Sequence, residues 1–327
     1  MVILTDKMGN EIREQSFDKM DIDLIKTADF EMIINAEEWD NAFEYGGRIF
    51  VPDSEFGGII GGIETATAEG NIKLTGHTWR GLLQKKIIFP PTGEAYKTVS
   101  GDLNVIIKEL IEDAGLSGIF SVSKAPTITV TFQFDRYVSL YEGLIKMLTS
   151  VGYRLNLLYV QGIRGLPGYV EISAQPITDY SKTVELSQDS QLEFTFKDIR
   201  NKVNHLVALG QGELADRLVL NLFLQPDGTV GSVPFYTGIE DVTEVYDDTT
   251  ISTMEELLEK GTEKLLELHG TSVMSMEIES LPSYIQIGDI VGGRDYITGL
   301  SMAEAITNII YKEEDYKVSI DYEIGQN

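Results

Sequence analysis

Short alternating stretches of apolar and polar residues dominate the first part of the chain and predict β-strands. The clearest run, residues 71–76, alternates strictly and places Ile72 and Leu74 on one face. Further short apolar runs lie at 30–34, 48–51 and 57–63. Glycine pairs flank the last of these, and glycines inside a strand indicate a bulge or a close backbone approach. This pattern predicts an antiparallel sheet or barrel over residues 1–95, with one short helix at 78–85.

Helical spacing takes over in residues 96–180. Ser100 is a suitable N-cap, Asp102 would fall in the first turn, and apolar residues then recur at helical intervals up to Gly115. A second helix follows Ser139, which has a glutamate three residues later and so forms a capping-box pattern. Because a β-like run and a hairpin pattern accompany these helices, the segment is predicted to be a small α/β module.

Strand patterns return in residues 181–327 and surround one predicted helix near 253–269. Thr253 is a suitable cap for this helix, whereas Gly261 interrupts it and weakens the helical pattern. The sequence therefore divides into β-rich residues 1–95, an α/β module at 96–180 and β-rich residues 181–327. The fold class is α+β, rich in β.

Composition narrows the classes of protein that fit this pattern. The chain has 327 residues, and 26 Lys and Arg oppose 52 Asp and Glu, which gives a net charge of −26. Such a balance argues against a surface that reads nucleic acid and against docking on anionic membrane. The sequence contains no cysteine, which excludes disulfides, thiolate nucleophiles, iron–sulfur clusters and cysteine-type zinc sites.

The start of the chain lacks the basic and apolar regions of a secretory signal, and no apolar run approaches the length of a membrane span. We therefore expect a soluble protein that is made in a cytoplasm and has no membrane anchor.

The residues that most often carry chemistry lack the spacing that chemistry needs. His77, His205 and His269 lie far apart and belong to no metal-binding motif. Acidic pairs such as 37–38 and 247–248 arise by chance in so acidic a chain. The glycine clusters lack the strand–loop–helix context of a phosphate-binding loop, and no nucleophile elbow occurs. The sequence predicts no enzyme, no cofactor and no catalytic, cofactor-binding or metal-ligating residue.

Acidic residues are concentrated in one segment of the predicted strands. Between residues 31 and 69, Arg48 is the only basic side chain. The nine acids of this segment are Glu31, Glu37, Glu38, Asp40, Glu44, Asp53, Glu55, Glu64 and Glu69. They fit an ordinary solvated face of a soluble protein. They also fit a wall that repels polyanions, past which DNA moves without sticking because no phosphate is neutralised.

The order of several short motifs resembles the phage tail hub and baseplate hub proteins. These motifs lie at 28–34, 48–53, 57–64, 75–83 and 87–91 in the first half, and at 199–204, 207–213, 217, 287–291, 306–311 and 317–324 in the second half. Each motif is short, so the resemblance rests on their order along most of the chain.

This resemblance implies a fold and an assembly. Such hubs have two tail-tube-like β-barrel subdomains with a small α/β module between them, and three chains form a ring of six barrel units. The ring continues the six-fold tail tube and adapts it to a three-fold tip. The implied partners are a tail tube or distal tail protein on one side and a tip, spike or fibre protein on the other. DNA would pass through the lumen only transiently.

The resemblance also implies a place for the chain and its acidic residues. The protein would be made in the cytoplasm of a bacterial host and would reside in the tail tip or baseplate of a virion, a prophage-encoded tail or a tail-like bacteriocin. The nine acids would face the lumen or a neighbouring subunit.

Two other functions are open at this point. One is a tail-associated cell-wall hydrolase, although the chain leaves no residues for the hydrolase domain that some hubs carry. The other is a carbohydrate-binding receptor module, which would use exposed aromatic side chains such as Trp39.

Overall fold

The chain folds into two compact units. One unit comprises Met1–Thr195 and Met274–Gln326, and the other is Phe196–Val273. The computed structural model describes residues 2–66, 68, 70–163, 165–182, 185–187, 193–196, 202–269, 274–278, 281, 284–294, 296–297, 299, 301–314 and 317–325. The predicted segments 1–95, 96–180 and 181–327 do not coincide with these units.

One large sheet joins the two ends of the first unit. Its N-terminal strands are β1 (Val2–Thr5), β2 (Glu11–Gln15), β3 (Lys19–Asp23), β4 (Asp29–Asn35), β5 (Arg48–Phe50), β6 (Gly57–Ala66) and β7 (Asn71–Thr78). Its later strands are β13 (Glu185–Ser187), β14 (Glu193–Phe196), β19 (Met274–Ile278), β20 (Ile290–Arg294), β21 (Ser301–Glu314) and β22 (Lys317–Ile324). The strand order is β14-β19-β22-β21-β3-β4-β7-β6-β5-β1-β2, and β20 pairs with β13 and β21.

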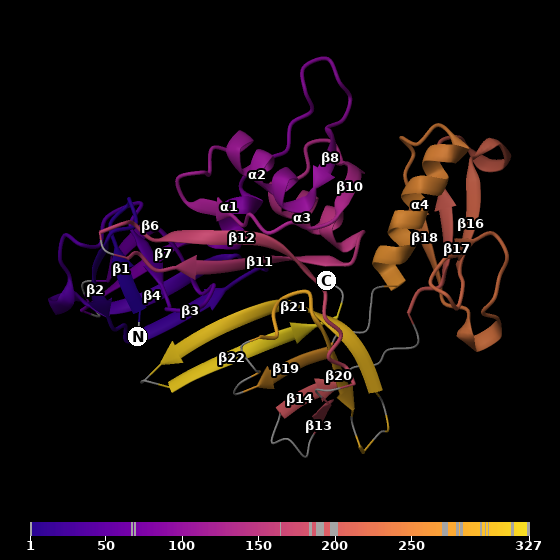
Figure 1. Ribbon diagram of the computed structural model, residues 1–327. Coiled ribbons are helices and arrows are strands. Elements are labelled where there is room, and N and C mark those ends of the chain that lie inside the picture. Colours follow the sequence, from indigo (N-terminus) through magenta and orange to yellow (C-terminus); the bar gives the residue numbers. More distant parts are fainter. Residues whose placement is uncertain are drawn as a thin grey trace. The chain divides into compact units, whose positions relative to one another are not determined.

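The long strand β21 connects the two strand sets. Its first half pairs with β20, and its second half pairs with β22 on one side and with β3 on the other. Figure 1 shows β21 lying beside β3, far from it in sequence, with β22 on the other side of β21. The strands that the sequence assigned to two regions are thus continuous in one sheet.

The predicted glycine bulge is present in this sheet. The register of β6 and β7 shifts between Ile60 and Gly62. Close backbone approach explains a second glycine, because a Cβ atom at Gly76 would lie 1.9 Å from the carbonyl oxygen of Ile59. As predicted, Ile72 and Leu74 of β7 are both buried.

Three helices and five strands form the α/β part of the first unit. The helices are α1 (Trp79–Gln84), α2 (Leu103–Asp113) and α3 (Leu140–Thr149). The strands are β8 (Thr98–Asp102), β9 (Phe120–Val122), β10 (Thr129–Gln133), β11 (Tyr153–Val160) and β12 (Tyr169–Pro176). They form the sheet β11-β12-β9 and the pair β8–β10. The sequence predicted two helices on a sheet for residues 96–180; α2, α3 and these five strands lie in that range, whereas α1 precedes it.

The caps of these helices confirm the prediction at Ser139 and correct the one at Ser100. The hydroxyls of Thr78 and Ser139 cap α1 and α3 by accepting hydrogen bonds from backbone amides. Helix α2, however, is capped by Asp102 and not by Ser100. Ser100 instead lies in β8, where its hydroxyl is 2.8 Å from that of Thr131.

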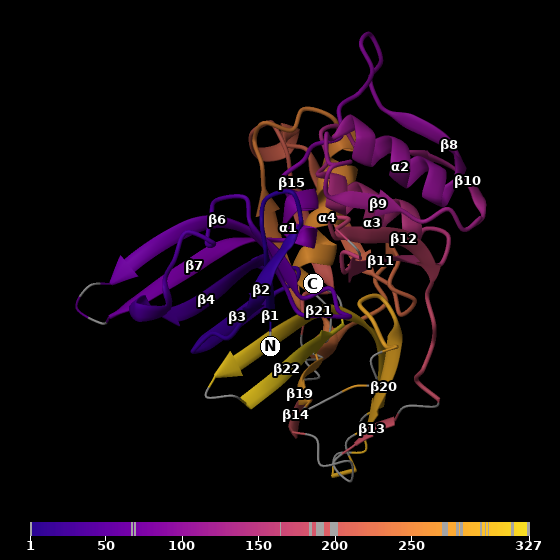
Figure 2. The ribbon, with the colours of Figure 1, turned by 60° about the vertical axis from the view of Figure 1, so that its left-hand side comes forward.

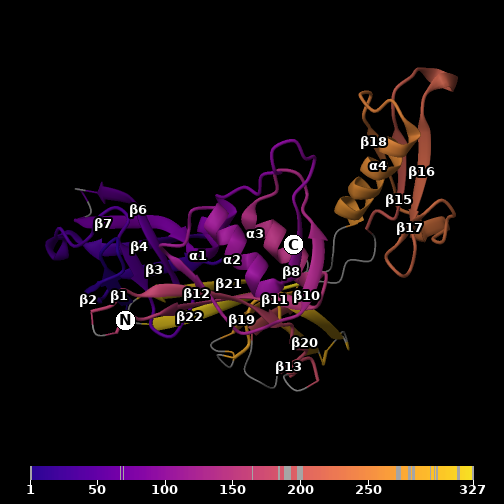
Figure 3. The ribbon, with the colours of Figure 1, turned by 45° about the horizontal axis from the view of Figure 1, so that its top comes forward.

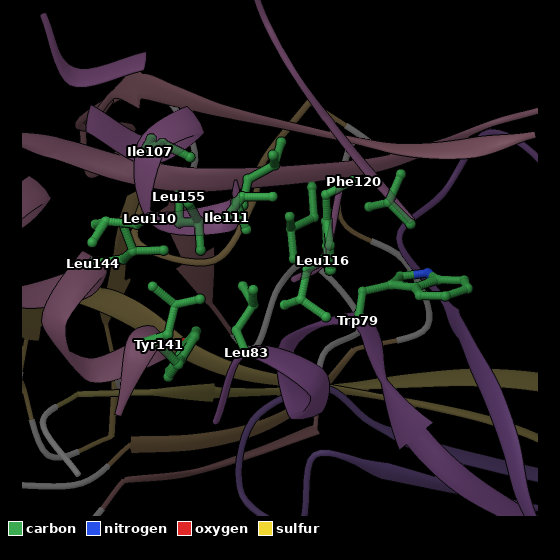
Figure 4. Packing of buried hydrophobic residues seen from close by; sticks show 14 of the residues in the cluster. Trp79, Leu83, Ile107, Leu110, Ile111, Leu116, Phe120, Tyr141, Leu144 and Leu155 are labelled. Carbon is green, nitrogen blue, oxygen red and sulfur yellow. The ribbon is translucent and has the colours of Figure 1, made fainter. Parts of the chain in front are cut away.

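A single hydrophobic core spans the predicted boundary at residue 95. Trp79 and Leu83 of α1 pack in one cluster with Ile107 of α2 and Leu144 of α3. Figure 4 shows Leu83, Ile107 and Leu144 around Leu155 of β11, with the Trp79 ring at the right of the view. Because this core joins residues on both sides of position 95, that position is not a domain boundary.

The second unit is a four-stranded sheet with one helix packed against it. Its strands are β15 (His205–Leu209), β16 (Val219–Leu224), β17 (Val230–Gly231) and β18 (Thr243–Asp247), in the order β17-β16-β15-β18. Helix α4 (Met254–His269) lies along this sheet (Figure 3). Short 3-10 turns occur at η3 (Leu214–Asp216) and η4 (Gly238–Glu240), and at η1 (Ala36–Glu38) in the first unit.

Gly261 does not interrupt α4 but allows it to approach the sheet. A Cβ atom at this position would lie 2.7 Å from Cδ1 of Leu222 and 3.2 Å from Cβ of Ala208. The glycine therefore faces the core formed by Leu206, Ala208, Leu222, Leu257 and Leu265.

The second unit is inserted into the strands of the first. The chain leaves the large sheet at β14 and returns at β19, and these two strands are neighbours. An insertion between adjacent strands leaves the host sheet intact. Residues 181–327 therefore contribute to both units, and the helix predicted near 253–269 belongs to the inserted one.

Candidate functional site on the N-terminal strands

The nine acidic residues predicted as lumen or interface residues occupy different environments. Glu31 and Glu64 lie on strands β4 and β6. Glu37, Glu38, Asp40 and Glu44 lie in the connection from β4 to β5, and Asp53 and Glu55 lie in the turn from β5 to β6. Glu69 lies outside the described residues. The structure therefore places these acids on a sheet face and in two connections, and it buries one of them, Glu55.

Lys73 holds the two acids of the sheet face together. Strand β7 lies between β4 and β6, and the side chains that alternate with its buried residues point to the opposite face. The Nζ atom of Lys73 is 3.4 Å from Oε2 of Glu31 and 3.2 Å from Oε2 of Glu64. The hydrogen bond to Glu64 and the charge of Glu31 raise the pKa of Lys73.

The same face carries charges onto the C-terminal strands. Asp21 of β3 pairs in register with Glu31 on one side and with Lys312 of β21 on the other. The Nζ atom of Lys312 donates to Oδ2 of Asp321 on β22 at 2.5 Å. We call the resulting row the charged band; its residues are Asp321, Lys312, Asp21, Glu31, Lys73 and Glu64.

Asp21 is the acid of the charged band that burial affects most clearly. Burial raises its pKa, and the neighbouring carboxylates of Asp23 and Glu31 act in the same direction. The nearby ammonium of Lys312 opposes this shift without cancelling it. The band thus carries four acids and two lysines, with Asp21 and Glu31 as direct neighbours, and Asp21 is ionised at some expense of stability.

The acids of the β4–β5 connection attach it to the first two strands. Asp40 forms an ion pair with Arg13, and the hydrogen bonds from Arg13 and from the amide of Ala42 lower the pKa of Asp40. The Oε1 atom of Glu44 accepts a hydrogen bond from the backbone amide of Lys7 at 3.2 Å. These exposed carboxylates therefore have partners within the chain.

Glu55 is buried, although the sequence led us to expect it to face a lumen or a neighbouring subunit. Its side chain accepts two hydrogen bonds from Arg80, from Nε at 2.7 Å and from Nη2 at 2.9 Å. Glu55 is 7% exposed and Arg80 is 1% exposed, and Arg80 also donates to the carbonyl oxygen of Leu155 at 3.3 Å. Burial alone would lower the pKa of Arg80, but the Glu55 carboxylate reverses the shift and raises it. This pair lies inside the chain and is not part of an exposed acidic wall.

The guanidinium of Arg48 does not neutralise the acids that surround it in sequence. Its side chain is buried, and its guanidinium donates to the carbonyl oxygens of Gly168 at 2.9 Å and Gly118 at 3.1 Å. It therefore ties β5 to the α/β part. The partners of the acidic segment are Arg13, Lys73 and Arg80, which lie outside residues 31–69 in sequence.

Trp39 lies in a stack of side chains rather than on an open platform. Its ring is half-buried and stacks on that of Phe43, with 5.1 Å between the centroids. The guanidinium of Arg13 lies 5.3 Å from the centroid of the Phe43 ring.

Three other residues that the sequence offered for chemistry, His205, His269 and Asp248, already form hydrogen bonds within the chain. The Nδ1 atom of His205 is 3.2 Å from Asp241, and that of His269 is 2.9 Å from the carbonyl oxygen of Val203. Hydrogen bonds from the side chain and amide of Thr250 lower the pKa of Asp248, whereas a general acid needs a raised one. Among the described residues, no group of three or more His, Asp or Glu side chains is arranged to hold a metal ion.

The helices of the described residues give one further observation. None of them combines the length and the apolar character that crossing a membrane requires.

Known proteins match this chain in structure but not in sequence. No protein family model matches the sequence, and no curated protein matches it. Solved structures of phage tail proteins are among those that match along nearly the whole chain. The tail protein of Neisseria meningitidis MC58 is 15% identical, with a TM-score of 0.53 and coverage of 100% of this chain and 97% of that one.

Two prophage proteins give similar values. The 43 kDa tail protein of prophage MuSo2 from Shewanella oneidensis is 13% identical, with a TM-score of 0.56 and coverage of 99% and 98%. A prophage tail protein from Listeria monocytogenes EGD-e is 11% identical, with a TM-score of 0.51 and coverage of 100% and 94%. The chain therefore has the fold of phage tail proteins, as the resemblance in the sequence implied.

Proposed function

We propose that the protein is a structural hub of a phage tail or tail-like particle. The observation that carries the proposal is the likeness to tail proteins over the full chain, both units included. The described residues add no constellation for catalysis that would favour an enzyme over a structural role.

In this proposal, the two strand sets of the large sheet are the two tube-like subdomains. Strands β1–β7 form one, and β13, β14 and β19–β22 form the other. Pairing of β21 with β3 fixes one set against the other within each chain. Three copies would then place six strand sets around a common channel, and a ring of this kind closes by rotation.

We assign the charged band to the wall of that channel. It crosses both strand sets on one face of the sheet, and its excess of carboxylate suits the passage of DNA without binding. A tail tube or distal tail protein would contact one end of the ring, and a tip, spike or fibre protein the other. The protein would thus reside in the tail tip or baseplate of a virion or tail-like particle.

Solution mass tests the assembly that this proposal requires. Light scattering after size exclusion, over a concentration series, should show a species near 109.2 kDa, three times the chain mass of 36.4 kDa. A monomer at every concentration would count against self-assembly and would favour the hydrolase and receptor functions. Digestion of cell-wall suspensions and binding to a glycan array, with Trp39→Ala as the control, would then be measured.

A further inference from the structure

A groove of about 620 Å³ runs between helix α2 and strand β9 in the α/β part. Figure 2 shows these two elements next to each other, and they are in contact. The volume falls within the range of ordinary binding pockets. Its lining comes from one side of α2, from β9 and from the loop that follows β9.

Strand β9 presents an open edge to this groove. It is the last strand of the sheet β11-β12-β9 and runs parallel to β12. The amide of Ser123 donates to Ile172, and the carbonyl oxygen of Ile119 accepts from Val170, so residues 119, 121 and 123 direct their backbone groups toward β12. The N–H and C=O groups of Val122 therefore point away from β12, toward the open edge.

Specific hydrogen bonds fix the walls of the groove. The carboxylate of Asp102, the cap of α2, accepts from the amide of Thr127 at 2.5 Å. Asn104 donates to the carbonyl oxygen of Ala125 at 2.8 Å and accepts from the amide of Ala174 at 2.9 Å. Because these bonds hold the loop after β9 against α2 and β12, the groove is formed before any ligand arrives.

The lining combines an apolar centre with charged side chains of both signs. Val105 is 52% exposed on α2, and Ile111 and Phe120 are buried at the base. Lys108 and Lys124 also line the groove, in a chain whose net charge is −26. The carboxylate of Asp102 accepts hydrogen bonds from backbone amides, and Glu112 is 3.6 Å from Lys108. Lys124 is exposed and takes part in none of the ion pairs of the described residues, so its ammonium can attract a carboxylate.

We propose that this groove binds an extended, acidic segment of a partner polypeptide. The segment adds as a strand to the open edge of β9, bonding to the backbone of Val122. One of its apolar side chains packs against Val105, and one of its carboxylates lies near Lys124. A strand edge beside a helix is an arrangement that serves peptide recognition by strand addition. This inference does not depend on the proposed role in a tail.

Selection of peptides on the intact chain tests the inference. The probe is a pool of random peptides of about ten residues, and the affinity of the enriched peptides is then measured by fluorescence polarisation. We expect acidic peptides with alternating apolar residues. Val105→Arg should weaken their binding about tenfold or more, because the new charge would occupy the apolar centre. Lys124→Glu should weaken it several-fold through charge reversal.

Glu109→Arg provides the matched control, because Glu109 is exposed on α2 but does not line the groove. Its affinity for the peptides should equal that of the unchanged chain. Slower exchange of the Val122 amide with peptide bound would give independent support. No enrichment of peptides, or binding that Val105→Arg leaves unchanged, would overturn the inference.

Discussion

Two sets of charged residues in the first unit show how differently the same side chains act when buried and when exposed. Glu55 and Arg80 form a pair that is almost wholly removed from solvent. Glu31, Lys73 and Glu64 form their pairs on the face of the sheet, where each side chain is about one third exposed or more. Glu31, Glu55 and Glu64 belong to the same acidic segment, so sequence alone does not separate them.

The two sets serve different purposes. The buried pair connects the turn after β5, helix α1 and strand β11, and thereby fixes the large sheet to the α/β part. Removing one partner would leave an uncompensated charge in the interior. The exposed pairs are screened by salt and contribute little to stability, so they are free to determine the charge of a surface.

Loss of Arg80 should have the largest effect. Arg80→Ala leaves Glu55 buried without its partner, and we expect the free energy of unfolding to fall by about 3–5 kcal/mol. Urea denaturation followed by circular dichroism measures this change. The double variant E55L/R80L should recover much of the loss, since it leaves neither charge behind. A loss below about 1 kcal/mol in Arg80→Ala would show that the pair is solvated.

Asp102 is an intermediate case, because its carboxylate is half-buried and accepts three backbone amides. Asp102→Ala should lower the free energy of unfolding by about 1 kcal/mol. The bonds to Thr127, Asn104 and Val105 outweigh burial and lower the pKa of Asp102, so its contribution is present at neutral pH and is lost as pH falls through that lowered pKa. Ser100→Ala is the control and should change stability less. Equal losses of unfolding free energy in the two variants would indicate that Ser100 also caps helix α2.

Asp21→Asn should have a smaller effect with the opposite sign. The raised pKa of Asp21 means that its ionised form opposes folding at neutral pH, and that this penalty disappears as pH falls through the raised pKa toward the ordinary value of 3.8. The melting temperature of Asp21→Asn should therefore exceed that of the unchanged chain at pH 7. The two should converge in acid. A lower melting temperature at pH 7 would show that attraction to Lys312 dominates at this site.

Lys73→Gln should have the smallest effect on stability. Without the ammonium, Glu31 and Glu64 repel each other, but salt screens charges on a surface. We expect the urea midpoint to fall slightly at low ionic strength and to match the unchanged chain at about 1 M salt. Lys146→Gln is a matched control for an exposed pair away from the band, since Lys146 binds Asp135 in the α/β part. A large loss that persists in high salt would place Lys73 in the same class as Arg80.

The sequence predicted the starts of two helices and the buried face of β7, because local spacing and capping residues determine these features. Thr78 and Ser139 begin their helices because a hydroxyl there meets amides within three residues. The alternation of residues 71–76 fixed the buried face of β7 and also placed Lys73 on the outward face, a signal from which the Glu31–Lys73 pair could have been expected.

Contacts between residues that are far apart in sequence determine the parts of the fold and of the candidate site that the sequence did not predict. The pairing of β21 with β3 joins residues almost a whole chain length apart, and no local pattern specifies it. Arg80 is 25 residues from Glu55 and reaches it only because α1 packs against the turn after β5. Asp102 replaced Ser100 as a cap because β8 pairs with β10 and extends the strand past Ser100.

A cryo-electron microscopy reconstruction of the assembled protein tests the central proposal most directly. We expect three copies around an open channel, with Glu31, Lys73 and Glu64 on its wall. A ring in which these residues lie on the outer rim or within the contact between neighbouring chains would contradict the assignment of the charged band to the channel. An assembly without a channel would contradict the proposed hub itself.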